Sequence, residues 1–152
     1  MRIGVIADTH GLMRPEALAA LAGMDRIFHA GDVGRPEVLR ALEEIAPVVA
    51  IRGNVDREGE VAALPEEATE VLEGVRLYML HDLKALTKDA GAAGWDVVIS
   101  GHSHAPVLRE ADGVMWLNPG AAGPRRFHLP VSLAILDLAG GHATARLVEL
   151  SV

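Results

Sequence analysis

Five apolar runs in this chain each stop at a short polar cluster, and this repeated pattern constrains the fold more than any other feature. The runs cover residues 3–7, 27–30, 48–51, 77–80 and 97–100. The clusters after them are Asp8-Thr9-His10, Gly31-Asp32, Gly53-Asn54, His81 and Gly101-His102-Ser103-His104. Such runs are typical of buried strands, and open α/β sheets bind ligands at the carboxyl ends of their strands. The pattern therefore predicts a metal centre that several strands build together.

The first half of the chain alternates predicted strands and helices. Strands are expected over 2–7, 26–30 and 47–51. Helices are expected over 15–21 and from 36 onward, because Pro15 and Pro36 suit a first helical turn. This βαβαβ order predicts parallel strands joined by right-handed crossovers.

The second half is richer in predicted strands. Residues 55–66 are expected to form a loop, 83–90 a helix and 96–100 a buried strand. Glycine-containing turns predict hairpins, which pair 68–72 with 75–80, 106–109 with 114–117, and 131–138 with 144–150. We expect a single α/β domain over residues 1–152, in which two mixed sheets pack face to face between helices.

Composition limits the function classes. The net charge of −7 argues against a general nucleic-acid or anionic-membrane surface. No apolar run reaches the length of a membrane span, and the first residues do not resemble a signal peptide, so a cytoplasmic protein is expected. Because cysteine is absent, any metal must be held by nitrogen and oxygen ligands. Trp95 and Trp116 are interpreted as core residues.

Each acidic or amide cluster alone also has an ordinary structural explanation. Asp8 and His10 share a face of an extended chain and can point at one ion, but a loop aspartate beside a hydrogen-bonded histidine looks the same. Asp32 can bridge two cations or cap the helix that begins at Pro36. The carbonyl oxygen of Asn54 can bind a metal or belong to a turn.

The histidines carry more of the signal. His81 ends a strand that would bury it, so either a metal or a core hydrogen bond must partner its ring. His102 and His104 follow a buried strand and are separated by one small residue, which favours metal ligands over an exposed polar loop. His29 is interpreted as a core histidine or as one that supports a ligand from behind. Asp56 is interpreted as a cap or a solvent-facing side chain.

Taken together, the candidate ligands outnumber the needs of one ion. A single ion takes about four to six ligands, whereas seven ligands with one bridging carboxylate suit two ions about 3.5–4 Å apart. The seven candidates are Asp8, His10, Asp32, Asn54, His81, His102 and His104.

The ordered set DxH, GD, GN, H and GHxH resembles the metallophosphoesterase (calcineurin-like) superfamily. The GNxD form and residues 117–120 (Leu-Asn-Pro-Gly) resemble its small YfcE-like phosphodiesterase branch. The resemblance spans residues 3–126 and implies a four-layer αββα sandwich with two mixed β-sheets. It implies that one metal is held by Asp8, His10, Asp32 and His104. The other would be held by Asp32, Asn54, His81 and His102.

The same resemblance implies a metal-dependent phosphoesterase, and within that class a phosphodiesterase. A hydroxide that bridges two divalent metal ions would hydrolyse a small phosphoester, with Mn favoured over Ni, Zn, Fe or Mg. Asp32 and Asn54 are the expected catalytic residues. Candidates to contact the substrate anion are Asn54, Arg35 and Arg125 or its neighbour Arg126. A homo-oligomer is left open.

Three positions depart from the family pattern. Many relatives have a histidine after GN that is proposed to protonate the leaving group or to contact phosphate, where this chain has Val55. Alkyl esters with poor leaving groups are therefore less expected as substrates, whereas activated esters, or a leaving group that water protonates, fit this position. Asp82 and Ala121 replace a usual glycine and serine.

The main alternative function is a protein-binding scaffold on the same fold, as in the retromer subunit. Retention of all seven ligand types favours the enzyme over this scaffold. An NAD-binding domain is disfavoured, because no GxGxxG follows the first predicted strand.

Overall fold

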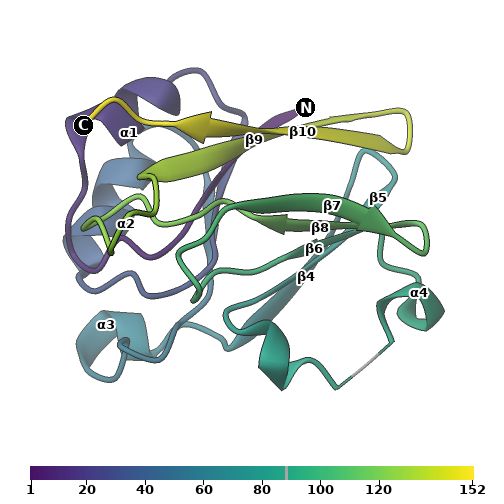
Figure 1. Cartoon of the computed structure of the whole chain (residues 1–152), viewed down its shortest axis with the longest axis horizontal. Coiled ribbons are helices and arrows are strands. Elements are labelled where there is room, and N and C mark those ends of the chain that lie inside the picture. The colour runs from purple at the N-terminus through teal and green to yellow at the C-terminus, as the bar shows by residue number, and fades with distance from the viewer. Residues whose placement is uncertain (88) are drawn as a thin grey trace.

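Two five-stranded sheets pack face to face in the computed structural model, which describes residues 1–87 and 89–152 (Figure 1). The first sheet has the order β10 (His142–Glu149), β9 (Ser132–Ala139), β1 (Arg2–Ile6), β2 (Arg26–His29) and β3 (Val48–Ala50). The second has the order β4 (Glu67–Leu72), β5 (Val75–Leu80), β6 (Val97–Ile99), β8 (Val114–Asn118) and β7 (Val107–Ala111). Each sheet is mixed, as predicted.

Three helices cover the outer face of the first sheet: α1 (Pro15–Ala20), α2 (Pro36–Glu43) and α3 (Gly59–Ala62). Proline occupies the first turn of both α1 and α2, as predicted. Leu21 and Leu42 are fully buried against this face of the sheet. The predicted βαβαβ unit is confirmed, because β1 pairs in parallel with β2, and β2 with β3.

The main core lies between the two sheets. Alternate side chains of central strands meet there, among them Val5, Phe28, Leu77 and Ile99, all at most 1% exposed. A smaller cluster on the outer face of the second sheet packs under α4 (Ala90–Ala93). Helix, sheet, sheet and helix therefore follow one another, which confirms the expected four-layer sandwich (Figure 1).

The three predicted hairpins are present. β4 pairs with β5, β7 with β8, and β9 with β10, all antiparallel. Both residues of each connecting turn have positive φ, a conformation that suits the right-handed twist of the strands. The turns are Glu73-Gly74, Asp112-Gly113 and Gly140-Gly141.

Two predictions about local structure are wrong. The predicted loop over 55–66 contains α3, which buries Val61 against the helical layer. The predicted helix over 83–90 is instead a 3₁₀ helix, η1 (Leu83–Ala85), and the separate α4, with residue 88 outside the described part. The Asp82 side chain caps the N-terminus of η1 and the Asp89 side chain caps that of α4, so the two are separate helices. None of the helices in the described residues is long and apolar enough to cross a membrane.

Candidate metal centre

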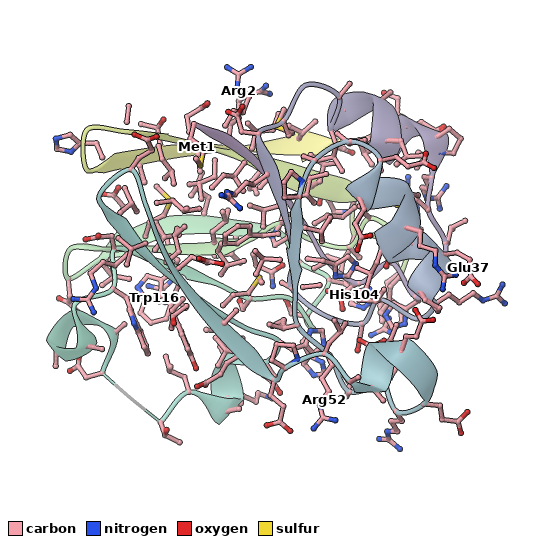
Figure 2. All side chains as sticks on the ribbon, turned by 180° about the vertical axis from the view of Figure 1, so that it is seen from behind. Met1, Arg2, Glu37, Arg52, His104 and Trp116 are labelled. Carbon is pink, nitrogen blue, oxygen red and sulfur yellow. The ribbon has the colours of Figure 1, made fainter. Side chains whose placement is uncertain are left out.

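All seven candidate ligands gather where the carboxyl ends of the two sheets' parallel strands meet. β1 leads to Asp8 and His10, β2 to Asp32, and β3 to Asn54. In the second sheet β5 leads to His81, and β6 to His102 and His104. Figure 2 shows His104 inside the molecule, whereas Glu37 lies on its outer surface on α2. Parallel pairing within each sheet, together with the face-to-face packing of the two sheets, thus brings residues nearly a hundred positions apart to one end of the sandwich.

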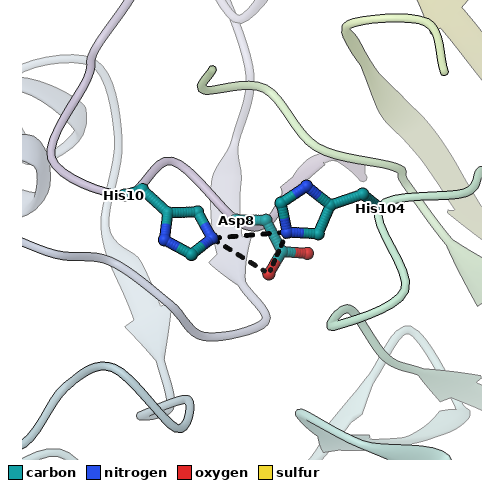
Figure 3. A group of neighbouring side chains, drawn as sticks. All are labelled: Asp8, His10 and His104. Atoms are coloured by element: carbon teal, nitrogen blue, oxygen red, sulfur yellow. Dashed lines mark hydrogen bonds and ion pairs between the residues drawn. The ribbon is translucent and has the colours of Figure 1, made fainter. Parts of the chain in front are cut away.

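The first group comprises Asp8, His10 and His104 (Figure 3). The Nε2 atoms of His10 and His104 are 3.3 Å apart. Each faces Oδ1 of Asp8, at 3.9 Å from His10 and 3.6 Å from His104. Two ligands that each lie about 2.1 Å from a shared ion are separated by about 3–3.5 Å, so this spacing is close to that of a coordination shell.

The second group comprises Asp32, His81 and His102, and Asn54 joins it. Oδ1 of Asn54 is 3.2 Å from Nε2 of His81 and 3.2 Å from Nδ1 of His102. Oδ2 of Asp32 is 3.3 Å from Nε2 of His81 and 3.5 Å from Nε2 of His10. Asp32 therefore lies between the two groups, where a bridging ligand would be.

The donor atoms fit divalent cations. Oδ1 of Asp8 is buried without a hydrogen-bond partner among the described residues, while its Oδ2 accepts a hydrogen bond from the backbone N–H of His102. An orphaned buried carboxylate oxygen is costly unless an ion satisfies it. His81 donates its Nδ1 proton to the carbonyl of Ala30 at 2.7 Å, which leaves the Nε2 lone pair of the neutral ring directed at the site.

The backbone at the site is strained. Eight non-glycine residues of the described chain have positive φ, and five of them are candidate ligands. These are Asp8, His10, Asp32, His102 and His104, with φ between 46° and 71°. Left-handed backbone costs about 1–2 kcal/mol per residue outside glycine, and such outliers cluster at functional sites. The left-handed backbone in the turns after the strands thus directs several candidate ligands toward the same site.

The two carboxyl groups have opposite pKa shifts. Burial raises the pKa of Asp8 to about 7, with the neighbouring Asp32 charge adding to the shift. Burial also opposes ionisation of Asp32, but hydrogen bonds from His81 and the backbone N–H of Val55, with the charges of His81 and His10, lower its pKa to about 2. Without a cation, the negative charge therefore concentrates on the residue between the two groups.

The histidine rings also differ. Burial lowers the pKa of His104 to about 4, with the nearby Arg126 charge adding to the effect. Burial would lower the pKa of His81 too, but its hydrogen bonds with Asp32 and the Ala30 carbonyl raise it instead. Burial lowers the pKa of His29 to about 3. A neutral ring is the form that binds a metal, so His104 is ready to act as a ligand over the whole neutral range.

Metal-free Asp8→Asn protein is expected to be more stable than the metal-free parent at pH 8. The folded-state pKa of Asp8 lies above its ordinary value of 3.8, so its contribution to the free energy of unfolding is present below about pH 4 and is lost as pH rises through about 7. The amide removes this loss, on the order of a few kcal/mol. Urea unfolding with chelator at pH 4 and pH 8 measures the effect.

The expected gap between the two proteins at pH 8 shrinks at pH 4. With Mn²⁺ at pH 8 the order reverses, because the parent gains binding free energy that the variant lacks. A variant less stable than the metal-free parent at pH 8 would contradict the charge argument.

Three polar residues outside the ligand set hold the site in place. The interpretation of His29 as a core histidine is confirmed. Its side chain is fully buried, and its Nε2 forms a hydrogen bond with the Thr9 hydroxyl at 3.0 Å. The Asn118 amide donates to the carbonyl of Gly101 at 2.9 Å, which fixes the turn before His102. In the sequence, only the family resemblance of residues 117–120 points to Asn118.

The interpretation of Asp56 as a solvent-facing side chain is wrong. Asp56 is 1% exposed and accepts hydrogen bonds from three backbone N–H groups. They belong to Val33 at 3.1 Å, Gly34 at 2.9 Å and Gly53 at 2.9 Å. Asp56 therefore ties the turn after β2 to the turn after β3. Its position three residues after Gly53 was the only sequence signal for this role.

Close approach explains two glycines next to the ligands. Gly31 has φ of +99°, and a Cβ there would lie 2.6 Å from Nδ1 of His81. A Cβ on Gly53 would overlap the carboxylate of Asp32. Gly31 and Gly53 directly precede the ligands Asp32 and Asn54, and a larger residue at either position would collide with a ligand side chain.

The three candidate arginines differ in how near they lie to the ligands. Arg35 is exposed, and its side chain lies close to Gly11, next to His10. Arg125 and Arg126 are exposed on one loop. Arg126 is near enough to Asp8 and His104 to influence their pKa values.

The model of the calcineurin-like phosphoesterase superfamily domain matches residues 1–141. The chain belongs to this superfamily. A probable metallophosphoesterase of Methanothermobacter thermautotrophicus is 35% identical, over 98% of this chain and 92% of its own. Phosphodiesterase YfcE of Escherichia coli is 29% identical, over 90% of this chain and 88% of its own. Both relatives of this calcineurin-like chain thus match nearly its whole length.

Solved structures show the same calcineurin-like fold. An archaeal phosphodiesterase superimposes with a TM-score of 0.80 at 24% identity, covering 97% of this chain and 100% of that one. Vps29 from Chaetomium thermophilum also has a TM-score of 0.80, at 18% identity, covering 99% of this chain and 95% of that one. The same fold therefore occurs both in a phosphodiesterase and in Vps29, so the fold alone does not determine the chemistry of the site.

Proposed function

We propose that this member of the superfamily is a phosphodiesterase that uses two divalent metal ions. The observation that carries the proposal is Asp32, whose carboxylate lies between the two groups of candidate ligands. Asp8, His10 and His104 would hold one ion with Asp32. Mn²⁺ is the proposed metal, since the ligand set mixes imidazole with carboxylate and amide oxygens.

Two bound cations would lower the pKa of water and offset the charge that develops on phosphoryl oxygens. The chain's own residues supply the rest. His81, held by the Ala30 carbonyl, presents Nε2 in a fixed tautomer. Asn54 offers an uncharged oxygen beside His102, so it adds no charge that would repel a phosphate. Arg126 contributes positive charge at the rim and would attract the substrate anion.

The position of Val55 limits the leaving groups. Its side chain is 44% exposed beside Asn54, and only its backbone N–H contacts the site, through Oδ1 of Asp32 at 3.0 Å. This residue cannot donate a side-chain proton to a departing alkoxide. We propose that the preferred substrates have leaving groups that need little protonation, such as aryl oxides.

Val55→His is expected to speed the hydrolysis of an alkyl phosphodiester by about 10–100-fold and to change that of a 4-nitrophenyl ester little. General acid catalysis contributes most when the leaving group is basic. The ratio of the two kcat/KM values, measured for both proteins, is the test. Equal acceleration of both esters would show that the imidazole acts otherwise, for instance by binding phosphate.

Hydrolysis of bis(4-nitrophenyl) phosphate by purified, chelator-treated protein tests the function itself. We expect turnover that Mn²⁺ or Ni²⁺ restores. His104→Ala should remove this turnover, whereas His142→Ala, which changes an exposed histidine on β10, should keep it. A parallel assay with 4-nitrophenyl phosphate decides between diester and monoester.

A protein-binding scaffold is the second candidate, because Vps29 shares the fold at a TM-score of 0.80. A scaffold does not need both ligand groups, yet the Asp and His side chains of each group lie close together in this chain. Absence of metal-dependent turnover, together with tight capture of a partner protein, would favour the scaffold. The single domain, the cytoplasmic location and any homo-oligomer stay predictions of the sequence.

A further inference from the structure

A cavity of about 510 Å³ opens beside the metal centre, on the outer face of the second sheet. Gly101, His102 and Asp82 belong to its wall, so it begins at the candidate ligands themselves. The volume lies within the range of about 300–1,000 Å³ that is typical of small-molecule sites. A substrate whose phosphate reached His102 would therefore have space for a further group on this side.

The far part of the cavity is apolar and partly aromatic. The side chains of Val98 and Val107 line it together with Trp116, and the Arg109 guanidinium lies over the Trp116 ring, 5.4 Å from its centroid. Trp116 is half-buried, so the prediction that it is a core residue holds for only part of its surface. Phe127 also lines the cavity and is 85% exposed, so its aromatic ring is accessible to an occupant.

The charges of the cavity match an anionic ligand. Lys84, Arg109 and Arg126 all line it, against the single carboxylate of Asp82. Asp82 lies at the end near the site, with Oδ2 3.7 Å from Nε2 of His102. An apolar floor with cations around it suits a molecule that joins a flat ring to a phosphate.

We propose that this cavity holds an aromatic ester group of the phosphodiester, with the phosphate at the metal centre. The inference rests on the proposed function and names its substrate class: phosphodiesters with an aryl or nucleobase-bearing ester group. The exposed ring of Phe127 gives the preference for a flat ring, and Trp116 adds apolar contact beside the Arg109 guanidinium that lies over it. Arg126, which lines the same cavity, supplies positive charge for the phosphate.

Binding of two phosphonates to Mn²⁺-loaded protein, measured by calorimetry, tests the cavity without requiring turnover. Phenylphosphonate is expected to bind at least tenfold more tightly than methylphosphonate, because only the phenyl group reaches the apolar floor. Equal affinities would overturn the inference. So would phenylphosphonate binding that is unchanged when the metal is removed, since the cavity would then be a docking pocket unconnected to the site.

Two adjacent residues of β7 supply a matched pair of variants. Val107 is 38% exposed and lines the cavity, whereas Leu108 is 37% exposed and points to the opposite face of the sheet. Val107→Trp should fill the cavity, abolish the preference for phenylphosphonate and raise KM for bis(4-nitrophenyl) phosphate at least fivefold. Leu108→Trp should keep both values, and thermal unfolding of each variant checks the fold.

The outcomes separate this inference from the proposed function. Metal-dependent phenylphosphonate binding without hydrolysis of any diester would leave the cavity assignment standing and overturn the enzyme. Diester hydrolysis with equal affinity for the two phosphonates, or with an undiminished phenyl preference in Val107→Trp, would leave the enzyme standing and overturn the cavity assignment.

Discussion

Asp32→Asn is expected to lower kcat/KM for bis(4-nitrophenyl) phosphate by on the order of 1,000-fold. Asp32 is the carboxylate nearest to both ligand groups, with Oδ2 3.5 Å from Nε2 of His10 and 3.3 Å from Nε2 of His81, whereas Oδ1 of Asp8 lies 3.9 Å and 3.8 Å from the same atoms. The amide keeps the size of the side chain and an oxygen that can accept the Val55 N–H. It removes the negative charge that would hold two cations close together.

Metal content gives an independent measurement of the same change. The parent protein is expected to bind two equivalents of Mn²⁺ after dialysis, and Asp32→Asn fewer than two. Asp137→Asn is the control, because it removes a half-buried carboxylate on β9 whose only ion-pair partner among the described residues is Arg2. A variant that retains two metals and parental activity would show that Asp32 is not the shared ligand.

The grouping of the candidate ligands at the strand ends could be predicted from two simple properties of parallel sheets. Buried strands need apolar runs, and parallel strands of one sheet end at one edge, so Asp8 and Asp32 could be placed together from sequence alone. The glycine-containing turns fixed the hairpins for a similarly local reason, since Asp112-Gly113 adopts the positive φ that such a turn requires.

What the sequence could not show depends on contacts between distant segments. No local pattern reveals that the ring of His81 is aimed by the carbonyl of Ala30, 51 residues away. The left-handed backbone at His102 and His104 is equally hidden, because residues other than glycine adopt it only when surrounding structure enforces it. The cavity at Trp116 requires β6, β7 and β8 to be side by side, which only the sheet order provides.

Asp56→Ala is expected to lower the free energy of unfolding by about 4 kcal/mol, the largest stability change that we expect from a single substitution outside the core. Its carboxylate accepts hydrogen bonds from the N–H groups of Val33, Gly34 and Gly53. Hydrogen bonds to a charged group contribute about 1.5–3 kcal/mol each, and removal of the shared acceptor leaves buried donors without a partner. Urea unfolding of the metal-free protein measures the loss directly.

Asp56→Asn separates the hydrogen bonds from the simple loss of a side chain. Oδ2 accepts from both Val33 and Gly53, whereas Oδ1 accepts from Gly34 alone. An amide oxygen in the Oδ2 position preserves two of the three bonds, so this variant should lose roughly half as much stability as Asp56→Ala. Equal losses for both variants would mean that the charge, and not the number of acceptors, decides the effect.

Asp56→Ala should also weaken metal binding, because the two turns that Asp56 joins carry the candidate ligands Asp32 and Asn54. Asp32 precedes the Val33 amide directly, and Asn54 follows the Gly53 amide. Release of these amides frees two ligands of the second group to move relative to His81, so Mn²⁺ affinity should fall by about 10–100-fold in Asp56→Ala. Calorimetric titration at a temperature where the variant remains folded is the measurement. An affinity equal to that of the parent would show that the strained turns hold the ligands without Asp56.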